Sequence, residues 1–324
     1  MPRLPASMFG IVLGLAGLGA CWRLAHRLWG LPGLVGEVIL GLASLVWAIL
    51  LMLYIAKWIA SRAEARAELG HPVQCCFIGL IGVATMLIGN AALPYARWLT
   101  FLLFLGGLVF TLGFALWRTG LLWQGERDAA DTTAILYLPA VAGTFVAGTS
   151  AAALGLADWG SLFFGMGFFT WLAIESVLLH RLYTGPSMAV PLRPTLGIQM
   201  APPVVGAIAY LAVVPGAPGI IAYALLGYGV FQAVLLLRLL PWIREAPFAP
   251  SYWAFSFGGT ALAATPMLML AHGAHGDAVA TLAPILFVAA NILIAVLVVG
   301  TLRLMAQGRL FPKPAAPAVP AGSA

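Results

Sequence analysis

Ten long apolar runs, separated by short polar gaps, fill almost the whole chain. A helix needs about 20 mostly apolar residues to cross the roughly 30 Å hydrocarbon layer, because each residue rises about 1.5 Å. All ten runs meet this length, so the pattern predicts ten transmembrane helices. The predicted spans are Ser7–Leu28, Leu34–Trp58, Val73–Leu93, Trp98–Leu122, Ala134–Leu156, Trp159–Arg181, Thr195–Val214, Gly219–Trp242, Ser251–Ala271 and Ala278–Met305.

The gaps between the runs alternate in length. Those after odd-numbered runs are very short, such as Ala157–Asp158, whereas those after even-numbered runs are longer, such as Ile59–Pro72. Short connections make consecutive helices lie antiparallel and side by side. The chain is therefore predicted to be five helical hairpins.

One longer gap, Ser61–His71, alternates basic and acidic side chains at Arg62, Glu64, Arg66 and Glu68. In a helix, Arg62 and Arg66 repel each other at i,i+4 spacing, and so do Glu64 and Glu68. We interpret this gap as a solvated helical extension that acts as a cytoplasmic spacer rather than a binding site.

Lysine and arginine gather on one side of the predicted topology. Of the 16 basic residues, 13 lie in or near the connections after even-numbered helices or near the two chain ends, and Arg23, Arg27 and Arg97 are the others. The positive-inside rule places the basic side in the cytoplasm, so both termini are predicted to be cytoplasmic. The residues on that side are Arg3, Lys57, Arg62, Arg66, Arg118, Arg127, Arg181, Arg193, Arg238, Arg244, Arg303, Arg309 and Lys313.

Composition agrees with a membrane protein. The chain is 62% hydrophobic and 8% charged, whereas about a quarter of the residues of a soluble domain are charged. The net charge of +6 is spread over separate short loops, so it does not form a nucleic-acid-binding patch. Residues 1–310 are predicted to form one membrane domain, and the Pro/Ala-rich stretch 311–324 a disordered cytoplasmic tail.

Odd-numbered runs carry helix-breaking residues well inside the predicted spans. Examples are Pro139, Pro202 with Pro203, and Pro266, while Pro284 is the comparable case in an even-numbered run. Proline frees a backbone carbonyl that needs a protein or water partner inside a membrane. A pore lining supplies such partners, so the odd-numbered helices are candidates to surround a central axis. Close helix packing through small residues explains the same pattern, and the residues alone leave both explanations open.

Glu175 is the one carboxylate predicted to lie well inside a span. Ion-coupled transporters place carboxylates near the membrane midplane, because burial allows them to load and release a proton. Glu175 is thus the candidate proton site. Alternatively, it pairs with His180 or Arg181 on the same helix.

The sequence gives little support for enzyme chemistry, and no cofactor is predicted. His272, His275 and Asp277 lie close together, but a glycine-bearing turn explains them better than a metal site. Cys75 and Cys76 allow one further hypothesis of a different class, that the protein detoxifies a compound through its thiols.

The ninth run opens with WAFSFGG, residues 253–259. Phe257 is followed by two glycines, which leave room for its ring to swing. If the ninth helix lines an axis, Phe257 would close a narrow apolar pore by excluding water. A simply packed aromatic side chain is the other interpretation.

Six stretches resemble the tellurite-resistance/dicarboxylate transporter family, which includes bacterial tellurite-resistance proteins and the plant slow-type anion channels. The resemblance runs in order from about Pro5 to Phe311. The stretches are Phe9–Ala16, Tyr137–Ala142, Leu162–Gly167, Gly197–Pro202 (GIQMAP), Leu236–Ile243 and Trp253–Gly258 (WAFSFG).

The resemblance implies an all-α homotrimer in the inner (plasma) membrane. Each subunit would have ten helices, arranged as five hairpins in quasi-fivefold order around a central pore. It also implies an anion conduit gated by Phe257, with Phe255 as the fallback gate. The candidate pore-lining residues are Gly10, Gly14, Gly143, Pro202, Phe255 and Gly258.

Members of this family are associated with tellurite, C4-dicarboxylates, sulfite, chloride and nitrate. The near-absence of carboxylates within the spans favours passive conduction of small inorganic or carboxylate anions, with tellurite resistance as a consequence. The alternative is a proton-coupled carrier that exports tellurite, C4-dicarboxylates or sulfite.

Overall fold

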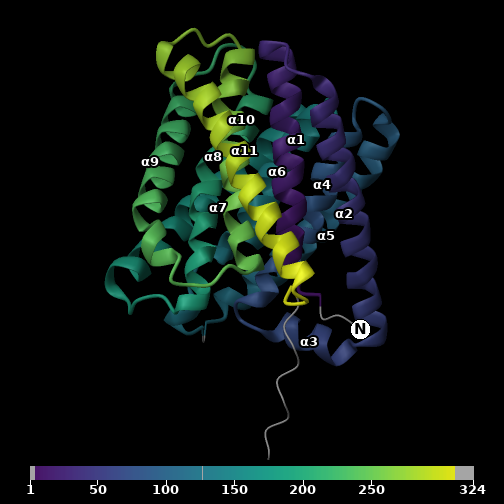
Figure 1. Ribbon diagram of the computed structural model, residues 1–324, viewed down its shortest axis with the longest axis vertical. Coiled ribbons are helices and arrows are strands. Elements are labelled where there is room, and N and C mark those ends of the chain that lie inside the picture. The colour runs from purple at the N-terminus through teal and green to yellow at the C-terminus, as the bar shows by residue number, and fades with distance from the viewer. Residues whose placement is uncertain (1–3, 126, 311–324) are drawn as a thin grey trace, which may run out of the picture.

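The computed structural model describes residues 4–125 and 127–310, and their regular structure is helical (Figure 1). Ten helical spans in this part of the chain are long and apolar enough to cross a membrane, which confirms the ten predicted spans. Arg3 and the predicted tail, residues 311–324, lie outside the described residues. The spans are Ala6–Trp29, Gly33–Ala60, Gln74–Ala92, Arg97–Trp123, Ala134–Ala153, Ala157–Thr184, Val190–Val213, Ile220–Ile243, Pro250–Ala271 and Asp277–Ala306.

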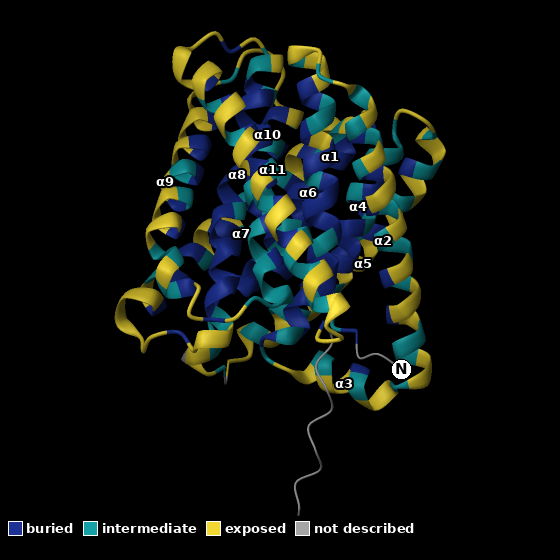
Figure 2. Ribbon diagram, viewed as in Figure 1, coloured by how far each residue is buried: buried dark blue, intermediate teal, exposed yellow. Residues whose placement is uncertain are grey.

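Burial divides the spans into two classes. In the odd-numbered spans, 61–83% of the most apolar stretch is buried, against 22–33% in the even-numbered spans. Dark, buried helices accordingly occupy the middle of the molecule, and exposed residues lie on its flanks (Figure 2). We call the odd-numbered spans the inner spans and the even-numbered spans the outer spans.

Each outer span is one uninterrupted α-helix that packs on the inner span before it. The pairs are α1 with α2, α4 with α5, α6 with α7, α8 with α9, and α10 with α11. The inner α-helices are α1 (Phe9–Trp29), α4 (Leu80–Ala92), α6 (Gly143–Ala153), α8 (Ala201–Val213) and α10 (Ala254–Ala271). The outer α-helices are α2 (Gly33–Ala60), α5 (Arg97–Trp123), α7 (Ala157–Thr184), α9 (Ile220–Ile243) and α11 (Asp277–Ala306).

The inner helices also contact one another in cyclic order. Helix α1 packs on α4, α4 on α6, α6 on α8, α8 on α10, and α10 again on α1. Residues far apart in the sequence therefore meet in the core.

Every inner span begins with a short segment that is not α-helical. Each of these starts contains a proline or lies within three residues of one, which is expected because proline lacks the amide hydrogen that an α-helix needs. The segments are the 3₁₀ turns η1 (Ala6–Met8), η2 (Gln74–Gly79), η4 (Ala134–Leu136), η6 (Val190–Met200) and η7 (Pro250–Trp253), and the π turn η5 (Leu138–Ala142).

The predicted spacer is helix α3 (Arg62–Gly70), at the end of the bundle where α1 begins (Figure 1). The helix is confirmed, but the prediction that its charges are solvated is wrong for Glu68. The Glu68 side chain is 8% exposed and accepts hydrogen bonds from Lys57 Nζ at 2.7 Å and from the Ala6 amide at 2.7 Å. Glu68 therefore links α3 to η1, the 3₁₀ turn that precedes α1.

Candidate pore and gate

A cavity of about 50 Å³ lies between the five inner spans. It has room for a few water molecules. None of its lining side chains is charged, and most are apolar. The lining comprises Ser7, Gly10, Leu13, Phe77, Leu80, Tyr137, Leu138, Val141, Ala142, Phe145, Ile198, Ala201, Pro202, Val205, Pro250, Ser251, Trp253, Ala254, Ser256 and Phe257.

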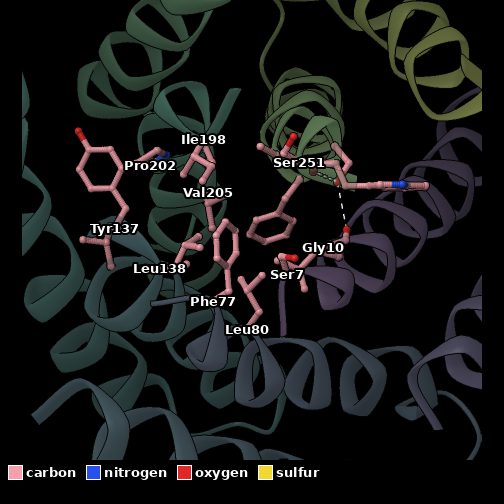
Figure 3. A pocket seen from close by; sticks show the side chains of 18 of the residues that line it. Ser7, Gly10, Phe77, Leu80, Tyr137, Leu138, Ile198, Pro202, Val205 and Ser251 are labelled. Atoms are coloured by element: carbon pink, nitrogen blue, oxygen red, sulfur yellow. Dashed lines mark hydrogen bonds between the residues drawn. The ribbon is translucent and has the colours of Figure 1, made fainter. Parts of the chain in front are cut away.

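The non-α-helical starts of the inner spans supply much of this wall. Ser7 comes from η1, Phe77 from η2, Leu138 from η5, Ile198 from η6 and Ser251 from η7. Figure 3 shows these side chains converging on one space, with the Phe77 ring near its centre. The cavity therefore lies where the backbone of every inner span departs from the α-helix.

Three of the residues singled out from the sequence line this cavity: Gly10, Pro202 and Phe257. The Phe257 side chain is half-buried and contacts the hydrophobic core. Its backbone carbonyl accepts a hydrogen bond from Thr260 Oγ1 at 3.1 Å, within α10. Phe257 and Phe77 approach the cavity from two different inner spans.

Gly14 and Gly258 lie where inner helices touch. A Cβ on Gly14 would lie 2.6 Å from Ser256 Cβ, and one on Gly258 would lie 3.0 Å from the Ala201 amide nitrogen. Beside them, Ser256 Oγ donates a hydrogen bond to the Gly10 carbonyl at 3.2 Å, which Figure 3 marks at Gly10. Glycine allows α10 to approach α1 and α8 closely here.

Gly143 and Phe255 face away from the cavity. A Cβ on Gly143 would lie 2.0 Å from Thr111 Cγ2 of the outer helix α5. The Phe255 ring lies over Gly197 in η6, 2.6 Å from where a Cβ of Gly197 would be. The glycine of GIQMAP thus makes room for the first phenylalanine of WAFSFG.

Glu175 lies behind the cavity wall, 7% exposed, among uncharged donors. Tyr137 Oη donates a short hydrogen bond to its carboxylate. Trp171 Nε1 donates at 2.9 Å, Gln199 Nε2 at 2.9 and 3.0 Å, and Tyr228 Oη at 2.5 Å. Four neutral donors from four spans therefore surround one carboxylate.

Within the described chain, the donors to Glu175 include neither His180 nor Arg181. Those two residues lie further along α7, near its end. Tyr137 connects Glu175 to the cavity, because it is one of the lining residues and its hydroxyl reaches the carboxylate.

Sequence reasoning missed most of the cavity wall and all the donors around Glu175. Phe77, Leu138, Ile198 and Val205 look like ordinary apolar residues of a membrane helix. The sequence feature that could have identified two of them is a nearby proline that interrupts the helix. Leu138 precedes Pro139, and Ile198 lies shortly before Pro202.

The other sequence candidates lie apart from the cavity lining. His272 Nδ1 contacts the Leu268 carbonyl at 2.9 Å within its own helix. Cys75 and Cys76 are buried free thiols with their sulfurs 3.9 Å apart. No group of three or more His, Cys, Asp or Glu side chains suited to a metal ion occurs in residues 4–125 and 127–310.

Comparison with known proteins identifies the family of this fold. The model of the family described as "Voltage-dependent anion channel" matches residues 3–302. The chain belongs to the voltage-dependent anion channel family. It is therefore a multi-pass membrane protein of an anion channel and transporter family, not an enzyme.

Relatives of this anion channel family member occur in bacteria and plants. The chain is 36% identical to the tellurite resistance protein TehA homolog of Haemophilus influenzae, over 96% of this chain and 93% of the relative. It is 23% identical to the S-type anion channel SLAH2 of Arabidopsis thaliana, over 96% of this chain and 61% of the plant protein. The resemblance noted in the sequence is confirmed.

Proposed function

We propose that this protein is a passive channel for small inorganic or carboxylate anions. In this proposal the five inner spans stand in quasi-fivefold order around a central pore, and Phe257 closes it. The channel would be a homotrimer in the inner (plasma) membrane, with one pore per subunit and both termini cytoplasmic. Membership of the anion channel family supports anions as the permeating species.

The observation that carries the proposal is the position of the cavity, between all five inner spans and at their non-α-helical starts. Irregular backbone at membrane depth is tolerated where it is buried in protein or lines a water-filled space. Five such segments meet at one cavity, which supports a conduit there. Its uncharged wall suits passage, because an anion held weakly can leave again.

Phe257 is proposed as the gate because it lines this small cavity, whose wall carries no charged side chain. A small apolar constriction closes to ions by excluding water. Phe257→Ala should therefore raise anion conductance at least tenfold in planar bilayers that contain the purified protein. Equal conductance of this variant and the wild type would reject the gate.

Two neighbouring phenylalanines provide matched controls. Phe255→Ala removes a ring that lies over Gly197 outside the cavity lining, so it should leave conductance close to the wild-type value. Phe77→Ala removes a second ring from the cavity wall and should give an intermediate rise. A larger rise for Phe255→Ala than for Phe257→Ala would move the gate to Phe255.

A proton-coupled carrier for tellurite, C4-dicarboxylates or sulfite is the second candidate function. It is favoured by Glu175, a buried carboxylate connected to the cavity through the Tyr137 hydroxyl. Flux into proteoliposomes should then follow an imposed pH gradient and lose that dependence in Glu175→Gln. A flux that follows only the anion gradient and the voltage supports the channel instead.

Tellurite resistance is proposed as a consequence of this transport. Expression of the chain in a tellurite-sensitive bacterial strain should raise the tellurite concentration that permits growth. A transport-dead variant, expressed at the same level, should not. If the wild-type chain and the transport-dead variant confer equal resistance, tellurite resistance does not depend on transport.

A further inference from the structure

A second hollow lies on the outside of the bundle, between the outer helices α2 and α5. It is a groove of about 590 Å³, with Ile81 of the inner helix α4 in its floor and Phe110 of α5 on one side. Residues of α2 from Leu51 to Ile59 form the other side, a distance of about 12 Å along the helix. This wall is apolar and lies at the height of the membrane-spanning segments.

Arg62 and Arg66 of α3 close one end of the groove. They are four residues apart, so both side chains lie on the same face of α3, and both are exposed. Within the described chain, neither guanidinium has a hydrogen-bonding or ion-pair partner, whereas the neighbouring Lys57 is paired with Glu68 at 2.7 Å. Glu64 is two positions from each arginine, so it does not share their face.

Two like charges at this spacing destabilise an isolated helix by about 0.2–0.5 kcal/mol. An anion between the two guanidiniums removes this repulsion, and arginine binds phosphate oxygens through paired hydrogen bonds. The pair also lies at the end of the spans that the positive-inside rule assigns to the cytoplasm, where membrane lipids carry negative charge.

We propose that this groove is a binding site for an anionic phospholipid. The lipid phosphate contacts Arg62 and Arg66, and an acyl chain lies along α2 between Leu51 and Ile59. A phospholipid is favoured over a free anion because the apolar wall and the arginine pair are continuous, and one molecule of this class matches both. The site lies outside the inner spans and is independent of the proposed gate.

The test is lipid binding to the full-length protein, purified in detergent and measured by native mass spectrometry. Dioleoyl phosphatidylglycerol is the anionic probe and dioleoyl phosphatidylcholine is the zwitterionic comparison. The double variant R62Q/R66Q should bind phosphatidylglycerol about 25-fold more weakly, because each basic residue near an anionic headgroup contributes roughly fivefold. Its binding of phosphatidylcholine should change much less.

The matched control is R238Q/R244Q, which removes two exposed arginines at the end of α9, away from the groove. It should bind phosphatidylglycerol as the wild type does. Equal loss in both double variants would mean that only overall charge matters, and would overturn the proposal. Displacement of phosphatidylglycerol by millimolar inorganic phosphate would overturn it too, because the site would then recognise a free anion.

Ile55→Trp tests the apolar part of the groove, since Ile55 is half-exposed on its wall and a larger ring fills the space without entering the core. This variant should lower phosphatidylglycerol binding while both arginines remain. If it instead lowers the fraction of oligomers and leaves lipid binding unchanged, a second copy of the chain occupies the groove and the proposal is wrong.

Discussion

The inner and outer spans differ in burial and in hydropathy, and in opposite senses. The inner spans are the more buried, yet their mean hydropathy is 1.4–1.9, against 1.8–2.8 for the outer spans. A water-soluble protein shows the reverse order, because it places its most apolar residues inside. Lipid requires apolar side chains on the outside, whereas contacts between helices accept glycine, serine and threonine.

The two sets of spans also differ in backbone regularity. Each inner span starts with a 3₁₀ or π segment, whereas each outer span is a single α-helix. A helix that faces lipid must satisfy its backbone hydrogen bonds internally, while one surrounded by protein can find partners in its neighbours. Irregularity thus occurs only where the surrounding protein supports it.

The largest effect on stability is expected from Glu175→Ala. Glu175 joins its own outer helix α7 to two inner spans, through Tyr137 and Gln199, and to the outer helix α9, through Tyr228. Removing it takes an acceptor from three buried residues, Tyr137, Trp171 and Gln199, and from the half-buried Tyr228. We expect a loss of about 3 kcal/mol or more, since an unsatisfied buried donor costs about 1–3 kcal/mol. The midpoint temperature in fluorescence-detected size-exclusion chromatography should fall markedly.

Asp158→Ala is the control, because Asp158 is an exposed carboxylate at the other end of the same helix α7. It should leave the midpoint temperature near the wild-type value. Similar small shifts in both variants would show that the inner and outer spans do not depend on the carboxylate.

A smaller but still clear effect is expected from Gly107→Val on the outer helix α5. A Cβ at Gly107 would lie 2.7 Å from the Gly82 carbonyl oxygen of α4, which cannot move without shifting the helix. The inner and outer helices would be forced apart, at a cost of about 1–3 kcal/mol. The same thermal measurement applies.

Gly106→Val is the matched control, one residue away on α5. No atom lies within 4 Å of a Cβ at this position, so valine should be tolerated. If both variants lose the same stability, the effect comes from helix propensity and not from the contact between the two layers.

The smallest effect is expected at the connection between α4 and α5, where Tyr95 Oη donates a hydrogen bond to Glu37 of α2 at 2.7 Å. This bond raises the pKa of Tyr95 above its ordinary value, because the carboxylate stabilises the protonated phenol. The contribution is therefore present below the ordinary tyrosine pKa and is lost as the pH rises through the raised one.

Tyr95→Phe should accordingly lower the midpoint temperature slightly near neutral pH and converge with the wild type in strongly alkaline buffer. Thermal unfolding measured between neutral and alkaline pH checks this. A difference that stays constant across that range would assign the effect to packing of the ring.

Much of the fold was predictable because lipid imposes simple requirements. The length of the apolar runs predicted all ten spans. The short connections after odd-numbered runs predicted that the spans pair as hairpins. The least accurate start was that of the seventh span, predicted at Thr195 and observed at Val190. The five extra residues belong to η6, where Pro191 and Pro194 conceal a helical segment from a search for α-helical periodicity.

The site was predictable only in part. Prolines and glycines in odd-numbered runs indicated an inner set of helices, yet Gly14 and Gly258 serve close packing, while Gly10 and Pro202 line the cavity. These roles have the same sequence signal. Close packing and cavity lining can be distinguished only when the neighbouring helix is known, because both favour small side chains.

The sequence by itself determined the number of spans, their pairing and the family, because each depends on local hydropathy or on motifs in order along the chain. Only the tertiary structure decided which side chains share the cavity and which donors surround Glu175. Tyr137, Gln199 and Tyr228 come from three different spans, and no local sequence pattern predicts that all three contact Glu175. A buried carboxylate takes whatever donors the packed helices bring within reach, and that depends on the whole bundle.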